Sequence, residues 1–392
     1  MGLNGAALPD FPWDALAPAK RVAGEHPGGM VDLSVGTPVD PTPAVVRAAL
    51  ERAADSPGYP QTVGTPELRA AITDWFARRR GVPDLPEDGV LPTVGSKEAV
   101  ALLPALLGLG AGDVVLHPQV AYPTYDVGAR LAGAQPVAVG IDPATWPESV
   151  AGARVRLIWL NSPGNPHGHV LNAGQLRAIV TWARRHGVVV AADECYAELG
   201  WSERWQAEPI PSLLDPRVSD GDLSGLLVLY SLSKQSNLAG YRAAFAAGDP
   251  ALVAPLREVR RHAGMIVPGP IQAAMTAALH DDAHVAEQKA RYGRRRAVLL
   301  DAVRAAGLQP DPQSEAGLYL WLRAGAVGEP GPEGATGSWA LVEALAARGI
   351  LVAPGVFYGP AGEGYVRMAL TASDERIDAA ASRLSQGGPL VR

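Results

Sequence analysis

Residues 156–194, RLIWLNSPGNPHGHVLNAGQLRAIVTWARRHGVVVAADE, contain one strand–helix–strand unit. The apolar run RLIWLNSP predicts a strand, AGQLRAIVTWARRHG predicts an amphipathic helix that ends at a glycine, and VVVAADE predicts a second strand. Both strands lack an apolar–polar alternation, which is typical of parallel sheets that helices cover on both faces. This unit therefore predicts an α/β domain.

The same alternation continues on both sides of this unit. A helix is predicted over residues 66–80, because Pro66 stands in its first turn and Gly81 closes it. The strands DVVLHP and PVAVG flank the helix PTYDVGARLAG, and the apolar run LLVLYSLS follows the central unit. We expect a large domain over residues 46–280, with a mostly parallel sheet sandwiched by helices.

The pattern changes near residue 270. One or two long charged helices come first, and the strands GLYLWLR, ILVAP and YVRMAL then alternate with the helix SWALVEALAARG. This order predicts a smaller α+β domain over residues 281–392, with the N-terminal segment 1–45 packed against it. Between its elements, residues 324–337 include seven Gly or Pro in fourteen positions, which predicts a loop.

Composition excludes several classes of protein. The chain has 34 Lys and Arg against 40 Asp and Glu, so its charge of −6 offers no basic surface for nucleic acid or an anionic membrane. A single cysteine, Cys195, excludes an internal disulfide framework and fits a reducing compartment. No apolar stretch reaches the ~20 residues of a membrane span, and the N-terminal residues do not resemble a targeting segment. We expect a cytoplasmic enzyme that acts on small molecules.

Lysine is rare in this chain, and one lysine stands in an unusual place. Only Lys20, Lys97, Lys234 and Lys289 occur, and Lys234 ends the apolar run LLVLYSLSK. A partly desolvated lysine can lose its proton near neutral pH and form a Schiff base, which arginine cannot do. Taken alone, Lys234 could equally be a strand-end lysine that reaches solvent.

The neighbours of Lys234 decide between these interpretations. Together with Ser231, Ser233 and Arg242, it resembles the signature of fold-type-I, class I/II aminotransferases, which use pyridoxal phosphate. Further pieces of the same family occur in the family's order along almost the whole chain: Gly36-Thr-Pro38, Tyr59 with GTPELRAAI, Gly95-Ser96-Lys97-Glu98, AYPTY, NSPGNPHG, DECY, AGLYLW, APGVFYG and YVRMAL.

The resemblance implies a role for each residue around the cofactor ring. Lys234 would bind the cofactor covalently and later move the substrate's α-proton. Asp193 would face the pyridine nitrogen and keep it protonated, so that the ring acts as an electron sink. Asn165 and Tyr196 would donate hydrogen bonds to the phenolic oxygen of the ring, and Tyr122 would stack on its face.

The resemblance also implies where the phosphate and the substrate bind. Backbone N–H groups at the start of a helix, two hydroxyls and a guanidinium would hold the phosphate, and they come from Gly95, Ser96, Lys97, Ser231, Ser233 and Arg242. Tyr59 would reach the phosphate of a neighbouring subunit, which implies a homodimer. Gly36, Asn165 and Arg367 would hold the substrate, Arg367 by a fork to the α-carboxylate. The side chain of Lys97 is expected to point outward.

Within the family, the chain is most similar to actinobacterial-type succinyldiaminopimelate aminotransferases. This implies glutamate as donor and N-succinyl-2-amino-6-oxopimelate as acceptor, a step of lysine and diaminopimelate synthesis. Arg260, Arg261 or His262 is a hypothetical binder of the succinyl carboxylate, with a solvated helix face as the alternative. An aminotransferase of another amino acid, a cofactor-dependent C–S β-lyase and a non-enzymatic regulator are the other functions to consider.

Two further motifs suggest chemistry but have simpler interpretations. The pair His167-Gly-His169 is expected in a solvated turn rather than in a metal site, because no third ligand stands nearby. Cys195 is expected to be a small buried residue rather than a nucleophile. No metal ion is predicted.

Overall fold

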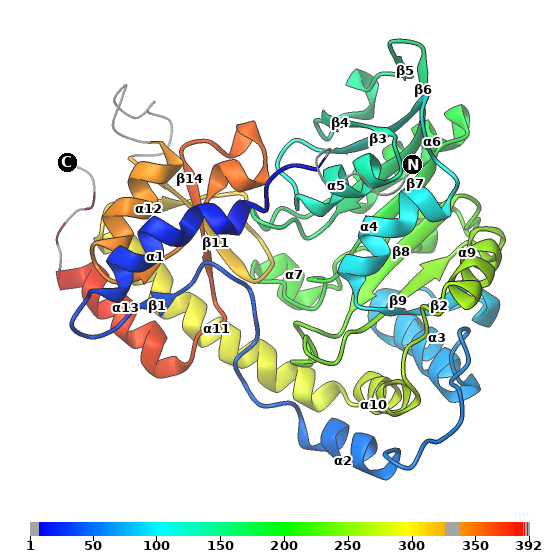
Figure 1. Ribbon diagram of the computed structural model, residues 1–392, viewed down its shortest axis with the longest axis horizontal. Coiled ribbons are helices and arrows are strands. Elements are labelled where there is room, and N and C mark those ends of the chain that lie inside the picture. The colour runs from blue at the N-terminus through cyan, green and yellow to red at the C-terminus, as the bar shows by residue number, and fades with distance from the viewer. Residues whose placement is uncertain (1–7, 326–336, 387, 389, 391–392) are drawn as a thin grey trace.

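The computed structural model describes residues 8–325, 337–386, 388 and 390. Most of the loop predicted at 324–337 lies outside these residues, as does the start of the N-terminal segment. Figure 1 shows a larger part built on a central sheet and a smaller part built on β11 and β14, with the long helix α11 (Asp282–Ala305) running from one towards the other.

The sheet of the larger part is mostly parallel, as predicted. Its strand order is β2-β9-β8-β7-β6-β3-β4, and the short β5 pairs with β6. The pairs that join β4, β3, β6, β7 and β8 are parallel, whereas β9 runs antiparallel to both of its neighbours. The strands are β2 (Val90–Val94), β3 (Asp113–Pro118), β4 (Gln135–Val139), β5 (Ser149–Val150), β6 (Ala153–Asn161), β7 (Val189–Asp193), β8 (Leu226–Ser231) and β9 (Ala243–Gly248).

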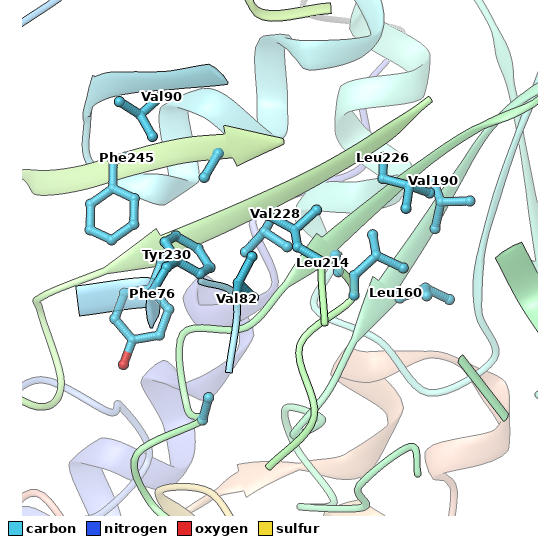
Figure 2. Close-up of a cluster of buried hydrophobic side chains, with 14 of the residues drawn as sticks. Phe76, Val82, Val90, Leu160, Val190, Leu214, Leu226, Val228, Tyr230 and Phe245 are labelled. Carbon is cyan, nitrogen blue, oxygen red and sulfur yellow. The ribbon is translucent and has the colours of Figure 1, made fainter. Parts of the chain in front are cut away.

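Helices cover this sheet on both faces. The helices of this part are α2 (Ala44–Arg52), α3 (Pro66–Arg80), α4 (Ser96–Leu106), α5 (Thr124–Leu131), α6 (Ala173–His186), α7 (Glu203–Ala207), α8 (Pro216–Ser219), α9 (Pro250–His262) and α10 (Gly269–His280). Successive residues of β8 point to opposite faces. Leu227 and Leu229 pack with residues of α4, α5 and α9, whereas Val228 and Tyr230 pack with residues of α3, α6 and α10. Figure 2 shows the second of these clusters, in which Val228 and Tyr230 lie with Phe76 and other apolar side chains.

Local sequence signals set the ends of α3 where they were expected. The Thr65 hydroxyl accepts a hydrogen bond from the Leu68 N–H at 3.2 Å, Pro66 occupies the first turn, and Gly81 takes the left-handed conformation with φ of 67°. A glycine is favoured there because it adopts positive φ without the strain of a Cβ. The predicted helix over 66–80 is confirmed.

The smaller part is a four-stranded antiparallel sheet with helices packed on it. Its strand order is β10-β11-β14-β13. The strands are β10 (Leu308–Pro310), β11 (Tyr319–Ala324), β13 (Ala353–Pro354) and β14 (Tyr365–Ala369), and the other helices are α12 (Ser338–Ala346) and α13 (Asp374–Gln386). Separate strands and helices of this kind make an α+β arrangement, as predicted.

The N-terminal segment lies against this smaller part. Strand β1 (Val31–Asp32) pairs in parallel with β12 (Ile350–Leu351), and α1 (Ala17–Gly24) packs on α12. The boundaries at 45/46 and 280/281 stay predictions. Over the described ranges, no helix combines the length and the apolar character that crossing a membrane requires.

Candidate active site

The predicted site residues gather around one cavity of about 510 Å³. In the central sheet, Asn161, Asp193 and Ser231 stand at the carboxyl ends of β6, β7 and β8, the edge where ligands bind in such sheets. All the residues that the resemblance implies, except Gly95 and Tyr59, line this cavity, which we call the Lys234 cavity: Gly36, Ser96, Lys97, Tyr122, Asn165, Asp193, Tyr196, Ser231, Ser233, Lys234, Arg242 and Arg367. Four of its lining side chains are cationic and one is acidic, so the cavity favours anions.

Lys234 lies in the turn that follows β8. Its Nζ donates a hydrogen bond to the Gly36 carbonyl. Burial lowers the pKa of Lys234, and the charges of Arg367 and Arg242 lower it further, whereas Tyr319 and Cys195 raise it. An amine with a lowered pKa is unprotonated more often near neutral pH, which a nucleophile or a base requires.

Asp193 is buried, and hydrogen bonds hold both its carboxylate and its backbone carbonyl. Its oxygens accept hydrogen bonds from the Cys195 N–H at 3.1 Å and from the Tyr125 hydroxyl at 3.1 Å. The Asn161 amide donates to its backbone carbonyl at 2.9 Å. Burial raises the pKa of Asp193, although these hydrogen bonds and the charge of Lys234 act in the opposite direction. A cationic ring nitrogen would be a strong partner for such a carboxylate.

A cradle for an anion lies beside the start of α4. The Ser231 hydroxyl donates to the Ser233 hydroxyl at 2.7 Å and accepts from the Ser233 N–H at 3.1 Å. Arg242 has a φ of 55°, an uncommon value for a residue with a side chain. Its guanidinium occupies the space where a side chain at position 95 would lie, because a Cβ on Gly95 would fall 2.0 Å from it. Gly95 therefore leaves room for Arg242.

Arg367 is a buried cation that no carboxylate of the described residues neutralises. Its side chain is 3% exposed, and its NH1 and NH2 groups donate to Asn165 Oδ1 at 3.0 Å and to the Ser34 carbonyl at 2.5 Å. The Nε–H group has no hydrogen-bond partner among the described residues. A buried charge is costly unless an opposite charge or hydrogen bonds compensate it. Arg367 therefore suits an anionic group of a ligand.

Tyr319 belongs to this site, although only its motif AGLYLW was recognised in the sequence. Its ring lies 4.0 Å from the Arg367 guanidinium, and its hydroxyl is 3.3 Å from that of Tyr196. A Cβ on Gly36 would fall 2.1 Å from the Tyr319 hydroxyl, so Gly36 has to be a glycine for this packing. Burial acts to raise the pKa of Tyr319, but Arg367 and Lys234 outweigh it and the pKa is lowered.

Sequence reasoning missed other residues that line the cavity or support it. Phe11 and Trp13 line the Lys234 cavity from the N-terminal segment, and no sequence signal distinguishes them from ordinary apolar residues. Tyr125 is the second tyrosine of AYPTY, and its position one helical turn after Tyr122 could have indicated that both approach the same site. Cys195 lines the cavity beside Asp193 and is buried as expected.

The structure corrects one expectation, that for Arg260, and adds to two others. Lys97 is exposed, as expected, but it also lines the cavity, with its Nζ 5.4 Å from the Phe11 ring and 6.0 Å from the Tyr122 ring. Arg260 cannot hold a substrate carboxylate, because it is 1% exposed and forks onto Glu98 at 2.7 and 3.1 Å. His167 stands in a turn, and both His167 and His169 are partly exposed, as expected; His167 also lines a second cavity.

Tyr59, Arg261 and His262 stand outside the Lys234 cavity of their own chain. Tyr59 is fully exposed, and Arg261 pairs only with Glu258, at 3.8 Å. Their predicted roles stay predictions. Within the part of the chain that the structure describes, no group of three His, Cys, Asp or Glu side chains could hold a metal ion.

The family model for class I and II aminotransferases matches residues 28–384. The chain belongs to this family. This aminotransferase is 54% identical to a probable aminotransferase of Mycobacterium tuberculosis, over 97% of this chain and 86% of the relative. It is 53% identical to the 4-dedimethylamino-4-oxo-anhydrotetracycline transaminase of Streptomyces rimosus, over 96% and 99%. It also resembles the solved structure of a probable N-succinyldiaminopimelate aminotransferase of Thermus thermophilus, with a TM-score of 0.81, 29% identity and coverage of 96% and 100%.

Class I and II aminotransferases depend on pyridoxal phosphate, and the residues of the Lys234 cavity fit this cofactor. The paired hydroxyls of Ser231 and Ser233 and the guanidinium of Arg242 offer donors for a phosphate. Asp193 supplies a buried carboxylate, and Lys234 supplies an amine with a lowered pKa. Membership in this pyridoxal-phosphate-dependent family therefore agrees with the chemistry of the Lys234 cavity.

Proposed function

We propose that this aminotransferase takes the amino group of glutamate and transfers it to N-succinyl-2-amino-6-oxopimelate, in the cytoplasmic synthesis of diaminopimelate and lysine. Arg367 is the main observation in favour of a substrate with a carboxylate, because it is a buried cation that pairs with no carboxylate of the described residues. The likeness to the solved structure named a probable N-succinyldiaminopimelate aminotransferase supports the acceptor.

The residues of the cavity divide the work between them. Pyridoxal phosphate, when bound, supplies an electron sink that stabilises negative charge at the substrate's α-carbon. Lys234 Nζ takes the α-proton of the amino donor in the first half-reaction. In the second half-reaction it gives a proton to the carbon of the acceptor that receives the amino group. Arg367 holds the α-carboxylate as a fork, and Asn165 Oδ1 keeps that fork in position. Asp193 keeps a positive charge on the ring nitrogen.

A second cation supports a substrate with two carboxylates. Both glutamate and the succinylated acceptor carry an anionic group beyond the α-carboxylate. Lys97 lines the same cavity as Arg367 and forms no ion pair with a described residue, so its ammonium is available for that group. The rings of Phe11 and Tyr122 lie 5.4 Å and 6.0 Å from this ammonium.

An aromatic ketone is a second candidate acceptor. The cavity is walled by Phe11, Trp13, Tyr122 and Tyr319, which could stack on a polycyclic substrate. The name of the relative from Streptomyces rimosus gives its substrate as 4-dedimethylamino-4-oxo-anhydrotetracycline, a polycyclic molecule whose 4-oxo group is a ketone. An aminotransferase of another amino acid and a C–S β-lyase are the further alternatives.

Absorbance of the purified holoenzyme tests the donor directly. We expect titration with glutamate to remove the absorbance band of the lysine-bound cofactor, and the succinylated acceptor to restore it. Restoration by an aromatic ketone but not by the succinylated acceptor would select the second candidate. Release of thiol and pyruvate from cystathionine, without loss of the band on adding glutamate, would instead identify a β-lyase.

We also propose that the enzyme is a homodimer. Tyr59 is fully exposed in a single chain, which is unusual for a large aromatic side chain away from a contact. A position at a subunit boundary, reaching the neighbouring phosphate cradle, accounts for this exposure. Sedimentation of the purified protein tests the proposal, and a monomer at micromolar concentration would contradict it.

A further inference from the structure

A second cavity, larger than the first, lies on the other side of Asn161. It has a volume of about 740 Å³, and we call it the His167 cavity. Its walls are mainly apolar, with Val139, Ile141 and Trp146 from the region of β4 facing residues of β6 and α6. The loop at residues 312–315 of the smaller part closes one side. Concave, mostly apolar sites with a few polar groups are typical of small-molecule binding.

Two hydrogen-bond donors on the walls of this cavity have no acceptor among the described residues. The Gln175 amide oxygen accepts a hydrogen bond from the Asn172 N–H at 2.9 Å, while its NH₂ group is bonded to no described residue. His167 provides the second donor. A ligand with an acceptor oxygen would form hydrogen bonds with these two groups.

The protonation state of His167 follows from its contacts. Its Nδ1 accepts a hydrogen bond from the His169 N–H at 3.0 Å. Burial lowers the pKa of His167 to about 3, so the ring is neutral at physiological pH. A neutral imidazole that accepts at Nδ1 carries its proton on Nε2. His167 therefore presents an N–H donor, not a positive charge.

The charge of the walls distinguishes this cavity from the Lys234 cavity. Among the described residues, no lysine or arginine lines it, and the only acidic lining residue is Glu315, which accepts a hydrogen bond from the Trp205 indole at 3.0 Å. His169 already pairs with Asp311 at 2.8 Å. An anionic ligand would gain no countercharge from these walls, whereas a neutral ligand with an acceptor oxygen would meet two donors.

We propose that the His167 cavity is a second binding site, for a small neutral and largely apolar molecule that carries a carbonyl oxygen. The two cavities have only Asn161 in common. Asn161 accepts the Asn165 N–H at 2.7 Å and donates to the Asp193 carbonyl at 2.9 Å, so the wall between the cavities also positions predicted catalytic residues. The site does not depend on which acceptor the enzyme uses.

A neutral naphthyl ketone, prodan, is the probe for this site, because its emission moves to shorter wavelength in apolar surroundings. We expect the holoenzyme to bind it saturably, with one molecule per chain, and glutamate not to displace it. The naphthalenesulfonate anion of similar size should bind more weakly. Absence of saturable binding, displacement by glutamate, or tighter binding of the anion would overturn the proposal.

A cavity-filling variant locates the probe. A Cβ on Gly140, which lines the His167 cavity, would meet no heavy atom within 4 Å, and Gly140 has no positive φ. We expect Gly140→Leu to weaken prodan binding by about tenfold or more, because the new side chain takes the ligand's space. Gly24→Leu is the matched control, since Gly24 also has open space and lines neither cavity. Equal binding by the two folded variants would contradict the proposed location.

A second variant tests the hydrogen bond without filling the cavity. In His167→Asn, the amide oxygen can still accept the His169 N–H, but the donor at Nε2 is lost. We expect prodan to bind about two- to tenfold more weakly and to emit at shorter wavelength, since its ketone loses a donor. His26→Asn is the control, because His26 Nδ1 accepts the Gly28 N–H at 3.0 Å in the same way, away from the cavity. The same loss in both variants, or in neither, would remove His167 from the site.

Discussion

Two lysines line the Lys234 cavity, and burial lowers the pKa of one of them, Lys234. In the unfolded chain this amine keeps its ordinary pKa of 10.5, so between the lowered pKa and 10.5 the unfolded state binds more protons. The stability of the cofactor-free protein therefore rises with pH across this window. At lower pH the folded protein bears the full cost of a buried charge.

We therefore predict that cofactor-free Lys234→Met unfolds at a higher temperature than the cofactor-free parent near neutral pH. Methionine keeps much of the volume of lysine and carries no charge to bury. The difference should shrink as the pH rises from the lowered pKa to 10.5 and be smallest above 10.5, where the parent lysine is neutral in both states. Thermal unfolding followed by circular dichroism measures it. A difference that stays constant with pH would mean that the charge of Lys234 is not the cause.

Asp193→Ala should still bind pyridoxal phosphate but lose most of its turnover. Without this carboxylate the ring nitrogen loses its proton, and the ring stabilises negative charge poorly. We expect a loss of kcat greater than the ~10²–10⁴-fold typical of one acid–base group. Steady-state kinetics with glutamate measure this loss, and Asp84→Ala, at an exposed position, is the control. A rate near that of the parent would contradict the role of Asp193.

At the scale of elements, an ion pair joins the last turn of α9 to the first turn of α4. The side chain of Arg260 is 2% exposed and that of Glu98 is 24% exposed. We predict that Arg260→Ala lowers the free energy of unfolding by about 3 kcal/mol, because Glu98 is left partly buried without its partner. Urea unfolding measures this change, and the KM for the acceptor should not change.

The neighbouring arginine provides the control for this experiment. The side chain of Arg261 is 70% exposed and lies 3.8 Å from Glu258, so Arg261→Ala should change stability by less than about 1 kcal/mol. If Arg260→Ala instead raised the KM for the acceptor at unchanged stability, the original hypothesis of a succinyl-binding arginine would return.

How far an element could be predicted depended on whether its signals are local. The ends of α3 were predictable because Thr65, Pro66 and Gly81 act on the backbone within a few residues. Strand β1 was not, because it consists of two residues and exists only through the pairing of Val31 with Ile350 in the run ILVAP, where a strand was predicted. A pairing across three hundred residues has no local signature in a single sequence.

At the scale of the whole molecule, the parts of the site also differ in whether a local sequence signal marks them. Lys234 and Asp193 stand in sequence motifs and were predicted, and the fold brings them to one cavity. Trp13 and Lys97 come from segments that meet only in the folded chain, so it could not be predicted that both side chains line the same cavity. The His167 cavity likewise depends on how the smaller part packs on the larger one.

The predicted role of Tyr59 in the neighbouring subunit can be tested only with the assembled dimer. If it serves the neighbouring subunit, each site combines Lys234 of one chain with the partner's tyrosine. Tyr59→Ala and Lys234→Ala should then each be impaired alone. In their heterodimer, the chain that keeps Lys234 receives an intact tyrosine from the other chain, so one of its two sites is complete.

We predict that mixing the two variants in equal amounts restores activity to about a quarter of the parent value, because random exchange makes about half of the dimers heterodimers and each has one complete site. Exchange has to be verified first, for instance by isolating heterodimers that carry two different affinity tags. The exposure of Tyr59 in the single chain favours this arrangement. If Tyr59 acted within its own chain, every site in the mixture would lack either the lysine or the tyrosine. Verified heterodimers without recovered activity would therefore place Tyr59 in the site of its own subunit.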